Sequence, residues 1–284
     1  MSGFLGRLVA RRELIGNPLC LGVDPHPDQL PDGLTADVDG IERFARGLIE
    51  AVGPRVVAVK INIAFFEAFG SAGWAALERT RADVPADLVC VIDAKRGDIG
   101  STAERYAAAV FEHLDADAVT LSPYLGEDAI EPFLDYPGRG AYLLARTSNP
   151  SAERLQGLRV DGTPLHLAVA RWVAERWRDG RVGLVVGATA PEELAAIRAA
   201  VPGPAFLVPG VGAQGGDLAS AVRHADGLLA PGLVAVSRGI AAASRGRDWQ
   251  AAAEAAASAL GVRMGEAMLH STASPAAAGH NGGS

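Results

Sequence analysis

Lysine and aspartate alternate at the end of an apolar run in the middle of the chain. Asp93 and Lys95 lie two residues apart, and Asp98 follows three residues later. Side chains two apart share one face of an extended strand, so Asp93 and Lys95 are expected to meet there. A fixed array of alternating charges can stabilise a negative charge that develops on a substrate, because it reorganises little during the reaction. The alternative is a structural ion pair that only satisfies buried charges.

The scarcity of lysine draws attention to two positions. Lys60 and Lys95 are the only lysines among 26 cationic side chains, and all the others are arginines. Biased base composition explains the arginine excess. Lysine, however, is a compact charge that can titrate, whereas arginine is a planar fork that stays charged. We therefore expect both lysines to have functions that arginine cannot perform. Lys60 and Asn62 also share a strand face.

Glycine-rich segments late in the chain suggest a phosphate site. Residues 209–217 read PGVGAQGGD, and Arg238 lies in the sequence VSRGI. Glycines let backbone N–H groups approach an oxyanion, and arginine offers two parallel donors. Tight turns alone would also explain the glycines, and the segment lacks the Gly-Lys-Ser/Thr ending of a P-loop.

The elements that position these residues are short apolar runs that alternate with alanine-rich stretches. The apolar runs predict eight strands, at 19–24, 56–62, 88–93, 118–122, 141–145, 182–187, 205–209 and 233–237. Helical patterns follow at 40–52, 65–82, 101–114, 126–135, 165–179, 191–200, 216–224 and 248–261, and the N-terminus reads as an amphipathic helix.

Eight strand–helix units in about 250 residues predict an α/β fold, a single-domain (β/α)8 TIM barrel over residues 1–262. A doubly wound open sheet stays open as the alternative, because a sequence does not show closure. Residues 263–284 are expected to form a disordered C-terminal tail, most clearly in the small, polar segment 271–284. In a TIM barrel the active site lies at the carboxyl ends of the strands, where the polar residues collect here.

Composition excludes several classes of protein. The net charge of −7 argues against a nucleic-acid binder, which would carry a basic face. No run of 18 apolar residues occurs, so no membrane span is expected. Cys20 and Cys90 lie inside apolar runs, which suits buried thiols and a cytoplasmic protein. The sequence shows no metal-binding histidine or cysteine pattern and no dinucleotide fingerprint, so we expect no metal and no cofactor.

Several motifs together resemble the orotidine 5′-phosphate decarboxylase family, especially its longer bacterial subgroup. DAKRGDIGST at 93–102 is similar to the family's Asp-x-Lys-x-x-Asp signature with its following Ile and Thr. The segments LCLGVDP, VKINIAFFEAFG, TSNP, VPGVGAQGGD and VSRGI occur in the family's order, over residues of about 19 to 240. Related sugar-phosphate barrels share the Asp-Lys-Asp signature. Its combination with Lys60, TSNP and GAQGGD is more specific.

The resemblance implies a cofactor-independent decarboxylation of orotidine 5′-monophosphate to UMP and CO2, the last step of de novo pyrimidine biosynthesis. It implies that Lys60, Asp93, Lys95 and Asp98 form the charge array. Lys95 would stabilise the carbanion at C6 and donate the proton to it.

The same resemblance implies roles for the residues that bind substrate. Asp24 and Lys60 would contact ribose hydroxyls, and Ser148 would hydrogen-bond the pyrimidine. The phosphate would be held by Gln214 and Arg238, with the backbone around Gly215 and Gly239. The family is dimeric, which implies a homodimer in which Asp98, Ile99 and Thr102 reach into the partner's site. Arg146 and Asn149 receive no role.

Three other functions remain open at this point. A metal-dependent 3-keto-sugar-phosphate decarboxylase, or a hexulose-phosphate synthase, would share the phosphate end and the Asp-Lys-Asp signature. Schiff-base chemistry at Lys95 or Lys60 needs a neutral amine, which the neighbouring Asp93 and Asp98 oppose. A barrel that binds a nucleotide without turning it over is the non-enzymatic alternative.

Overall fold

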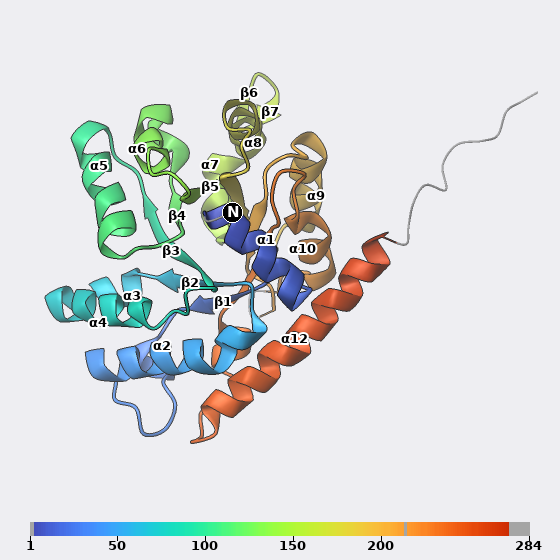
Figure 1. Cartoon of the computed structure of the whole chain (residues 1–284). Coiled ribbons are helices and arrows are strands. Elements are labelled where there is room, and N and C mark those ends of the chain that lie inside the picture. Colours follow the sequence, from blue (N-terminus) through green and yellow to red (C-terminus); the bar gives the residue numbers. More distant parts are fainter. Residues whose placement is uncertain (1–2, 213–214, 273–284) are drawn as a thin grey trace, which may run out of the picture.

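A closed parallel barrel forms the centre of the computed structural model, which describes residues 3–212 and 215–272 (Figure 1). All eight predicted strands form, so the TIM barrel is confirmed and the open sheet is excluded. Hydrogen bonds join them in the order β1-β2-β3-β4-β5-β8-β9-β10, and β10 pairs with β1. The strands are β1 Leu19–Val23, β2 Ala58–Asn62, β3 Val89–Arg96, β4 Ala118–Leu121, β5 Gly140–Arg146, β8 Val182–Val186, β9 Phe206–Pro209 and β10 Leu233–Val236.

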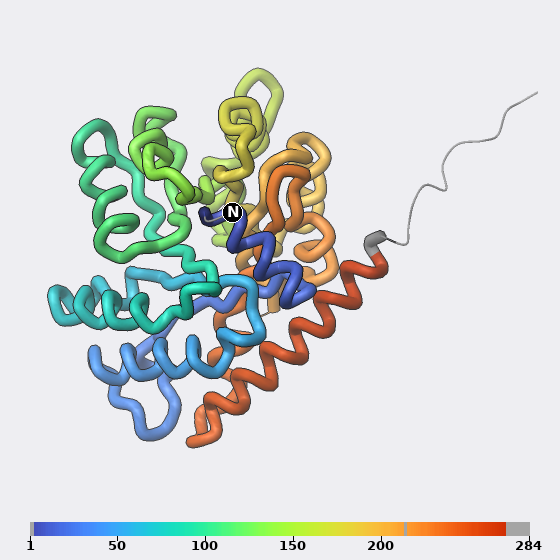
Figure 2. The backbone as a smooth tube through the Cα atoms, viewed as in Figure 1, coloured from blue at the N-terminus to red at the C-terminus, as the bar shows by residue number. Residues whose placement is uncertain are grey.

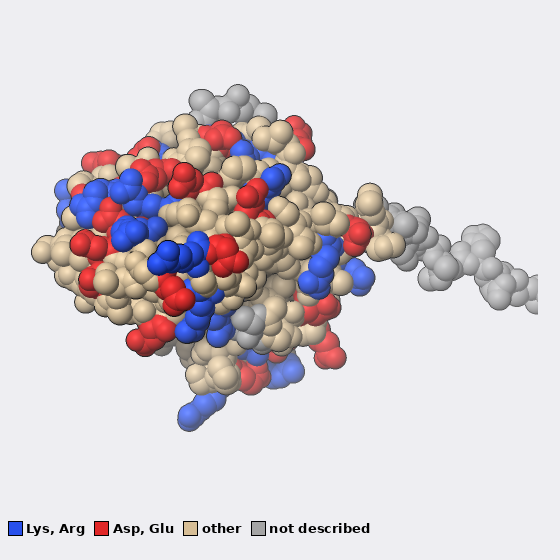
Figure 3. All heavy atoms as spheres, turned by 90° about the horizontal axis from the view of Figure 1, so that it is seen from below, with Lys and Arg blue, Asp and Glu red and all other residues tan. Residues whose placement is uncertain are grey.

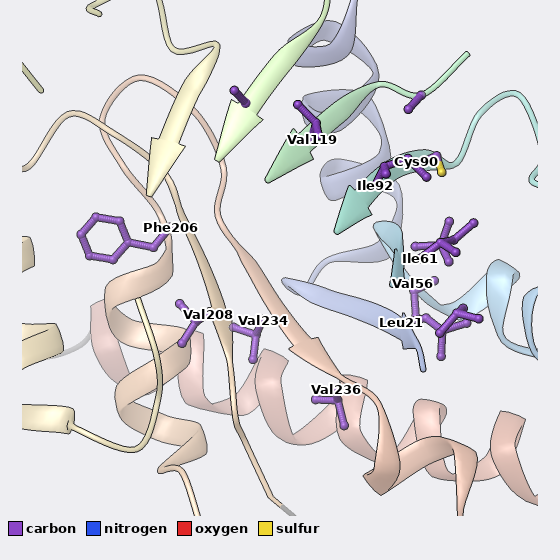
Figure 4. Close-up of a cluster of buried hydrophobic side chains, with 14 of the residues drawn as sticks. Leu21, Val56, Ile61, Cys90, Ile92, Val119, Phe206, Val208, Val234 and Val236 are labelled. Carbon is purple, nitrogen blue, oxygen red and sulfur yellow. The ribbon is translucent and has the colours of Figure 1, made fainter. Parts of the chain in front are cut away.

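The strands are mostly apolar because both of their faces are buried, and β3 becomes polar only toward its carboxyl end. Outward side chains such as Leu21, Ile61 and Val234 pack under the surrounding helices (Figure 4). Inward side chains such as Tyr142 and Leu207 form a second cluster inside the barrel. Each such side chain contributes about 1.5–3 kcal/mol relative to leaving it exposed.

Helices surround the barrel, with some predicted segments divided. The main helices are α2 Val38–Val52, α3 Ala64–Glu67, α4 Gly70–Ala82, α5 Gly100–Ala108, α6 Glu131–Leu134, α8 Leu165–Arg176, α9 Pro191–Ala200, α10 Leu218–Ala225 and α12 Trp249–Thr272. A π-helical turn, Ala109–His113, extends α5. The predicted helix 65–82 is broken because Gly70 has a φ of 61°, which a continuous right-handed helix does not allow.

The N-terminal helix α1, Phe4–Ile15, covers the end of the barrel where the strands begin. Phe4 and Leu8 are buried with the inward strand residues, and the ring of Phe4 meets Tyr142 edge-on. In Figure 2 this segment crosses in front of the centre of the barrel. A substrate site is therefore left for the opposite end.

The C-terminal helix corrects one boundary. The predicted tail from residue 263 is wrong for residues 263–272, because α12 continues to Thr272. Ala253, Ala257 and Met264 are buried on one face of α12, so the helix stays packed beyond the predicted limit. The remaining tail, 273–284, lies outside the described residues.

Short elements complete the connections. A hairpin of β6 Arg159–Val160 and β7 Thr163–Pro164 lies in the long loop after β5, preceded by α7 Glu153–Gln156. Its two-residue turn, Asp161-Gly162, has positive φ at both positions, which is the conformation that Asp-Gly favours. The helix α11, Arg238–Ala241, follows β10. Short 3-10 turns occur at Pro27–Gln29, Gly53–Arg55, Pro123–Leu125, Glu127–Ala129 and Pro150–Ala152.

The surface carries charges of both signs. On the face shown in Figure 3 the acidic and basic side chains lie intermixed. Over the part of the chain that the structure describes, none of the helices combines the length and apolar character needed to cross a bilayer.

Candidate active site

A cavity of about 530 Å³ opens where the barrel strands end. Polar side chains from successive strand ends converge on it, which is the expected place for a TIM-barrel site. They are Asp24 after β1, Lys60 and Asn62 on β2, Asp93 and Lys95 on β3, Thr120 on β4, Ser148 after β5 and Arg238 after β10. The prediction that Lys60 and Asn62 share a face is confirmed, because both line the cavity.

Asp93 connects the two lysines of the chain. Lys60 Nζ donates to Asp93 Oδ2 at 2.7 Å, and Lys95 Nζ donates to Asp93 Oδ1 at 2.6 Å. Lys60 Nζ also lies 3.6 Å from Asp24 Oδ1. Two carboxylates and two ammonium groups thus alternate across the ends of three neighbouring strands.

Burial and charge oppose each other in this array, and charge dominates. Burial would lower the pKa of Lys60, but the carboxylates of Asp24 and Asp93 outweigh it and raise that pKa. Burial would raise the pKa of Asp93, but Lys60 and Lys95 hold it well below its usual range. Both groups are therefore charged at neutral pH. A protonated Lys60 cannot attack a carbonyl, which opposes Schiff-base chemistry there.

The backbone at Lys95 differs from the extended strand that the sequence suggested. Lys95 has a φ of 48°, and the pairing of β3 with β4 shifts register between Ile92 and Arg96. The side chain nevertheless returns to Asp93. Both lysines line the cavity, but the Lys95 side chain is 50% exposed whereas that of Lys60 is 7% exposed, so Lys95 is the more accessible of the two.

The loop after β5 brings further polar groups to the cavity. Ser148, Thr147, Asn149 and Gln156 all line it. Gln156, which the sequence did not single out, accepts a hydrogen bond from Thr147 N at 2.9 Å and donates to Thr147 Oγ1 at 2.8 Å. No spacing rule marks this residue, because only the folded loop brings it back to the cavity.

Arg146, which had no assigned role, anchors this loop. Its guanidinium is buried and pairs with Glu193 at the start of α9 and with Glu153 of α7 at 3.1 Å. Arg146 therefore holds the loop in place, and it is not among the residues that line the cavity.

The described start of the glycine-rich segment, Pro209 to Val211, lines the cavity. Gly210, Gly212 and Gly215 have φ values of 94°, 78° and 80°, which glycine adopts without strain. Gly210 and Arg238 line the cavity. Gly215 and Gly239 do not line it, although they lie close to these two residues in the sequence. Within the described residues, no carboxylate lies within ion-pair distance of Arg238. Gln214 lies outside the described residues.

Three predicted site residues are not brought to this cavity. Asp98, Ile99 and Thr102 lie between the end of β3 and the first turn of α5, and none lines the cavity of its own chain. Asp98 Oδ1 accepts a hydrogen bond from Ile99 N at 2.8 Å, and Ile99 is 53% exposed. Thr102 is also exposed, and Asp98 is partly buried.

Comparison with known families decides the classification. A family model described as "Orotidine 5'-phosphate decarboxylase / HUMPS family" matches residues 17–256. The chain belongs to this family. It is 51% identical over 242 residues to orotidine 5′-phosphate decarboxylase of Roseiflexus sp. (strain RS-1), covering 84% of this chain and 89% of the relative. It is 45% identical over 265 residues to that of Methylibium petroleiphilum (strain ATCC BAA-1232 / LMG 22953 / PM1), covering 88% and 94%.

Solved structures of the family share the fold. The structure of Leishmania donovani OMP decarboxylase superposes with a TM-score of 0.80 at 38% identity, covering 96% of this chain and 100% of that one. The Leishmania donovani UMP synthase gives a TM-score of 0.82 at 40% identity, and the match spans 92% of this chain but 56% of that longer chain.

Proposed function

We propose that the protein decarboxylates orotidine 5′-monophosphate to UMP and CO2 in pyrimidine biosynthesis. The observation that carries this proposal is the bridge from Asp93 to both lysines at the mouth of the barrel. The family description covers more than one reaction, but the named relatives above are orotidine 5′-phosphate decarboxylases.

In this proposal Lys95 supplies the chemistry at C6. Breaking the bond between C6 and the carboxyl carbon leaves the electron pair on C6 and releases CO2. No neighbouring group of the pyrimidine delocalises that pair, so a fixed cation must stabilise it. Lys95 lines the cavity with its Nζ 2.6 Å from Asp93 Oδ1 and half of its side chain exposed, and it transfers its proton to C6.

Asp24 and Ser148 are proposed to bind the nucleoside. Asp24 Oδ1 is buried, and no described group donates a hydrogen bond to it. A buried carboxylate oxygen is costly without a donor, so a ribose hydroxyl is a suitable partner. Ser148 lines the cavity close to Gly187, where an added Cβ would come within 3.1 Å of the serine. We assign Ser148 to the pyrimidine.

The phosphate is proposed to bind at the end of the cavity formed by the loops after β9 and β10. Arg238 supplies two donors there and has no carboxylate competing for them among the described residues. Gln214 and the backbone of Gly215 and Gly239 complete this proposed site. Binding a distant phosphate lets the enzyme use that binding energy to order loops around the reacting carbon.

A homodimer is proposed to complete each active site. Asp98, Ile99 and Thr102 do not line the cavity of their own chain, and the nearby Tyr124 and Leu125 expose apolar surface. Pairing would place Asp98 beside the partner's Lys95, so that the array extends across the interface. The two cysteines are free and buried, which suits the proposed cytoplasmic location.

The test is an absorbance assay with orotidine 5′-monophosphate, run with and without EDTA. Wild type should consume the substrate in both conditions, and Lys95→Ala should be inactive. Arg43→Ala, at an exposed position of α2, is the matched control and should keep wild-type activity. Activity that EDTA abolishes would indicate a metal-dependent member of the family. An inactive wild type would refute the proposal.

A further inference from the structure

Thr120 lies at the centre of the charge array, although no motif pointed to it. It is the β4 residue beside Asp93 and Lys95, it lines the cavity, and it is 1% exposed. Its Oγ1 donates a hydrogen bond to Asp93 Oδ1 at 2.9 Å. The same Oγ1 accepts from the backbone N–H groups of Ala94 and Lys95, both at 3.0 Å. A hydroxyl has one proton to donate and two lone pairs, so all its bonding capacity is used.

The strand register explains why one residue makes all three contacts. Ile92 pairs with Val119 and Arg96 pairs with Leu121. Residues 93–95 of β3 therefore face Thr120 alone on β4. A bulge of this kind leaves N–H groups without ladder partners. The Thr120 hydroxyl takes the place of those partners for Ala94 and Lys95.

The bulge also turns the chain at Lys95 into the left-handed region, where a residue with a Cβ is strained. Strain of this kind persists when surrounding contacts hold it, and it is found at functional sites. Here Thr120 Oγ1 both accepts the backbone N–H groups that hold the turn and donates to the Asp93 carboxylate. The orientation of Asp93 and the direction of the Lys95 side chain are thus coupled through Thr120.

We propose that Thr120 is a positioning residue that holds Asp93 and Lys95 in the arrangement required for proton delivery. The proposal rests on the proposed function for its kinetic consequence. Thr120 needs no contact with the substrate for this role. The hydroxyl oxygen accepts two backbone N–H groups and so fixes the bulge that directs Lys95, while the single proton of the hydroxyl keeps Asp93 Oδ1 turned toward Lys95.

The test compares three variants by steady-state kinetics. Thr120→Val keeps the shape but removes the hydroxyl, and it should lower kcat about 100-fold with KM within about threefold, because small misplacements of catalytic groups cost rate. Thr120→Ser keeps the hydroxyl and should restore kcat to at least about a third of wild type. Thr80→Val is the matched control. Thr80 is also fully buried, but its Oγ1 has no partner among the described residues, so its kcat should not change.

Two further measurements separate positioning from folding. Titration with UMP should give Kd values within about threefold for wild type and Thr120→Val, because the residue positions Lys95 and leaves binding intact. In wild type, the amides of Ala94 and Lys95 should exchange hydrogen as slowly as paired strand amides. This measurement needs no variant, so it decides the contacts even if Thr120→Val does not fold.

Several results would overturn the inference. They are an unchanged kcat in Thr120→Val, a Thr120→Ser enzyme as slow as Thr120→Val, or rapid exchange at Ala94 and Lys95. If wild type does not decarboxylate orotidine 5′-monophosphate, the proposed function fails. The exchange experiment then still reports on the contacts of Thr120.

Discussion

The two lysines share one carboxylate partner but differ in how far they are buried, which predicts different effects on stability. Lys60→Ala leaves Asp93 and Asp24 without their buried cation and should cost about 3–5 kcal/mol of unfolding free energy. Lys95→Ala leaves Asp93 paired with Lys60 and removes a half-exposed group, so it should cost less than about 1 kcal/mol. Urea unfolding of the two variants and wild type measures the difference. Equal losses of unfolding free energy in the two variants would contradict the predicted difference between the two lysines.

The acid stability of the protein should depend on Asp93. Its folded-state pKa lies below its unfolded value, so its stabilisation is present above the unfolded pKa and is lost as pH falls through the folded one. Asp93→Asn should therefore be less stable than wild type at pH 7, and the gap should narrow below about pH 4, where unfolded aspartate takes up a proton. Unfolding free energies of both proteins from pH 7 to 3 test this, and a constant gap would refute it.

At high pH the stability of the protein should depend on Lys60, and here stability is lost as the pH rises. The folded-state pKa of Lys60 is raised, so its stabilisation is present below the unfolded lysine value of about 10.4 and is lost only as pH rises through the folded value. Between these two limits the array contributes a constant amount.

Residue type and spacing predicted most of the array but not all of its support. The scarcity of lysine marked Lys60 and Lys95, because a lysine kept among so many arginines suggests a function that arginine cannot perform. The two-residue spacing to Lys95 marked Asp93. Thr120 and Gln156 carried no such mark, since hydroxyls and amides are common in strands and loops. Their importance depends on the register of β3 against β4 and on the path of the loop after β5.

At the scale of elements, the amphipathic pattern of α1 predicted a helix, but it did not predict where on the barrel that helix packs. In the structure Arg11 donates to the carbonyl oxygens of Val56 and Gly53 at 3.0 and 2.6 Å, and pairs with Asp87 at 2.5 Å. One buried side chain thus ties the helix to the loops that lead into β2 and β3.

Arg11→Ala should consequently destabilise the barrel without changing the chemistry. The variant leaves two buried carbonyl groups without donors, which should cost about 2–3 kcal/mol. Thermal or urea unfolding checks the loss, with Arg43→Ala on the exposed surface of α2 as the control that should lose little. Because α1 lies at the far end of the barrel, KM and kcat should match wild type below the unfolding transition. A change in KM would show that α1 communicates with the site.

The elements that the sequence missed share a physical cause. The predicted helix ends at residue 261 and the predicted tail begins at 263, yet Met264 is buried and Ala267 and Met268 pack against the core. The hairpin after β5 is two residues per strand, too short for a periodic pattern, although its Asp-Gly turn was a usable signal. In both cases tertiary contacts outweighed local composition.

At the scale of the whole molecule, the barrel collects residues from distant parts of the sequence at one end. Continuous apolar runs predicted the strands well because parallel strands are buried on both faces. Closure required hydrogen bonding between β10 and β1, which no local pattern encodes. The proposed pairing of subunits is likewise not encoded by a local pattern. The segment with Asp98, Ile99 and Thr102 does not line the cavity of its own chain.

The proposed sharing of active sites makes a quantitative prediction for mixed subunits. Lys95→Ala and Asp98→Ala homodimers should each be strongly impaired. After the two are unfolded and refolded together, random pairing makes about half of the dimers hybrid, and in each hybrid one site combines an intact Lys95 with an intact Asp98. Activity should therefore recover to about one quarter of wild type. Differently tagged subunits allow the hybrid fraction to be measured directly. Hybrids that form but remain inactive would place Asp98 outside the partner's site. As a control, each variant is unfolded and refolded alone and should stay impaired.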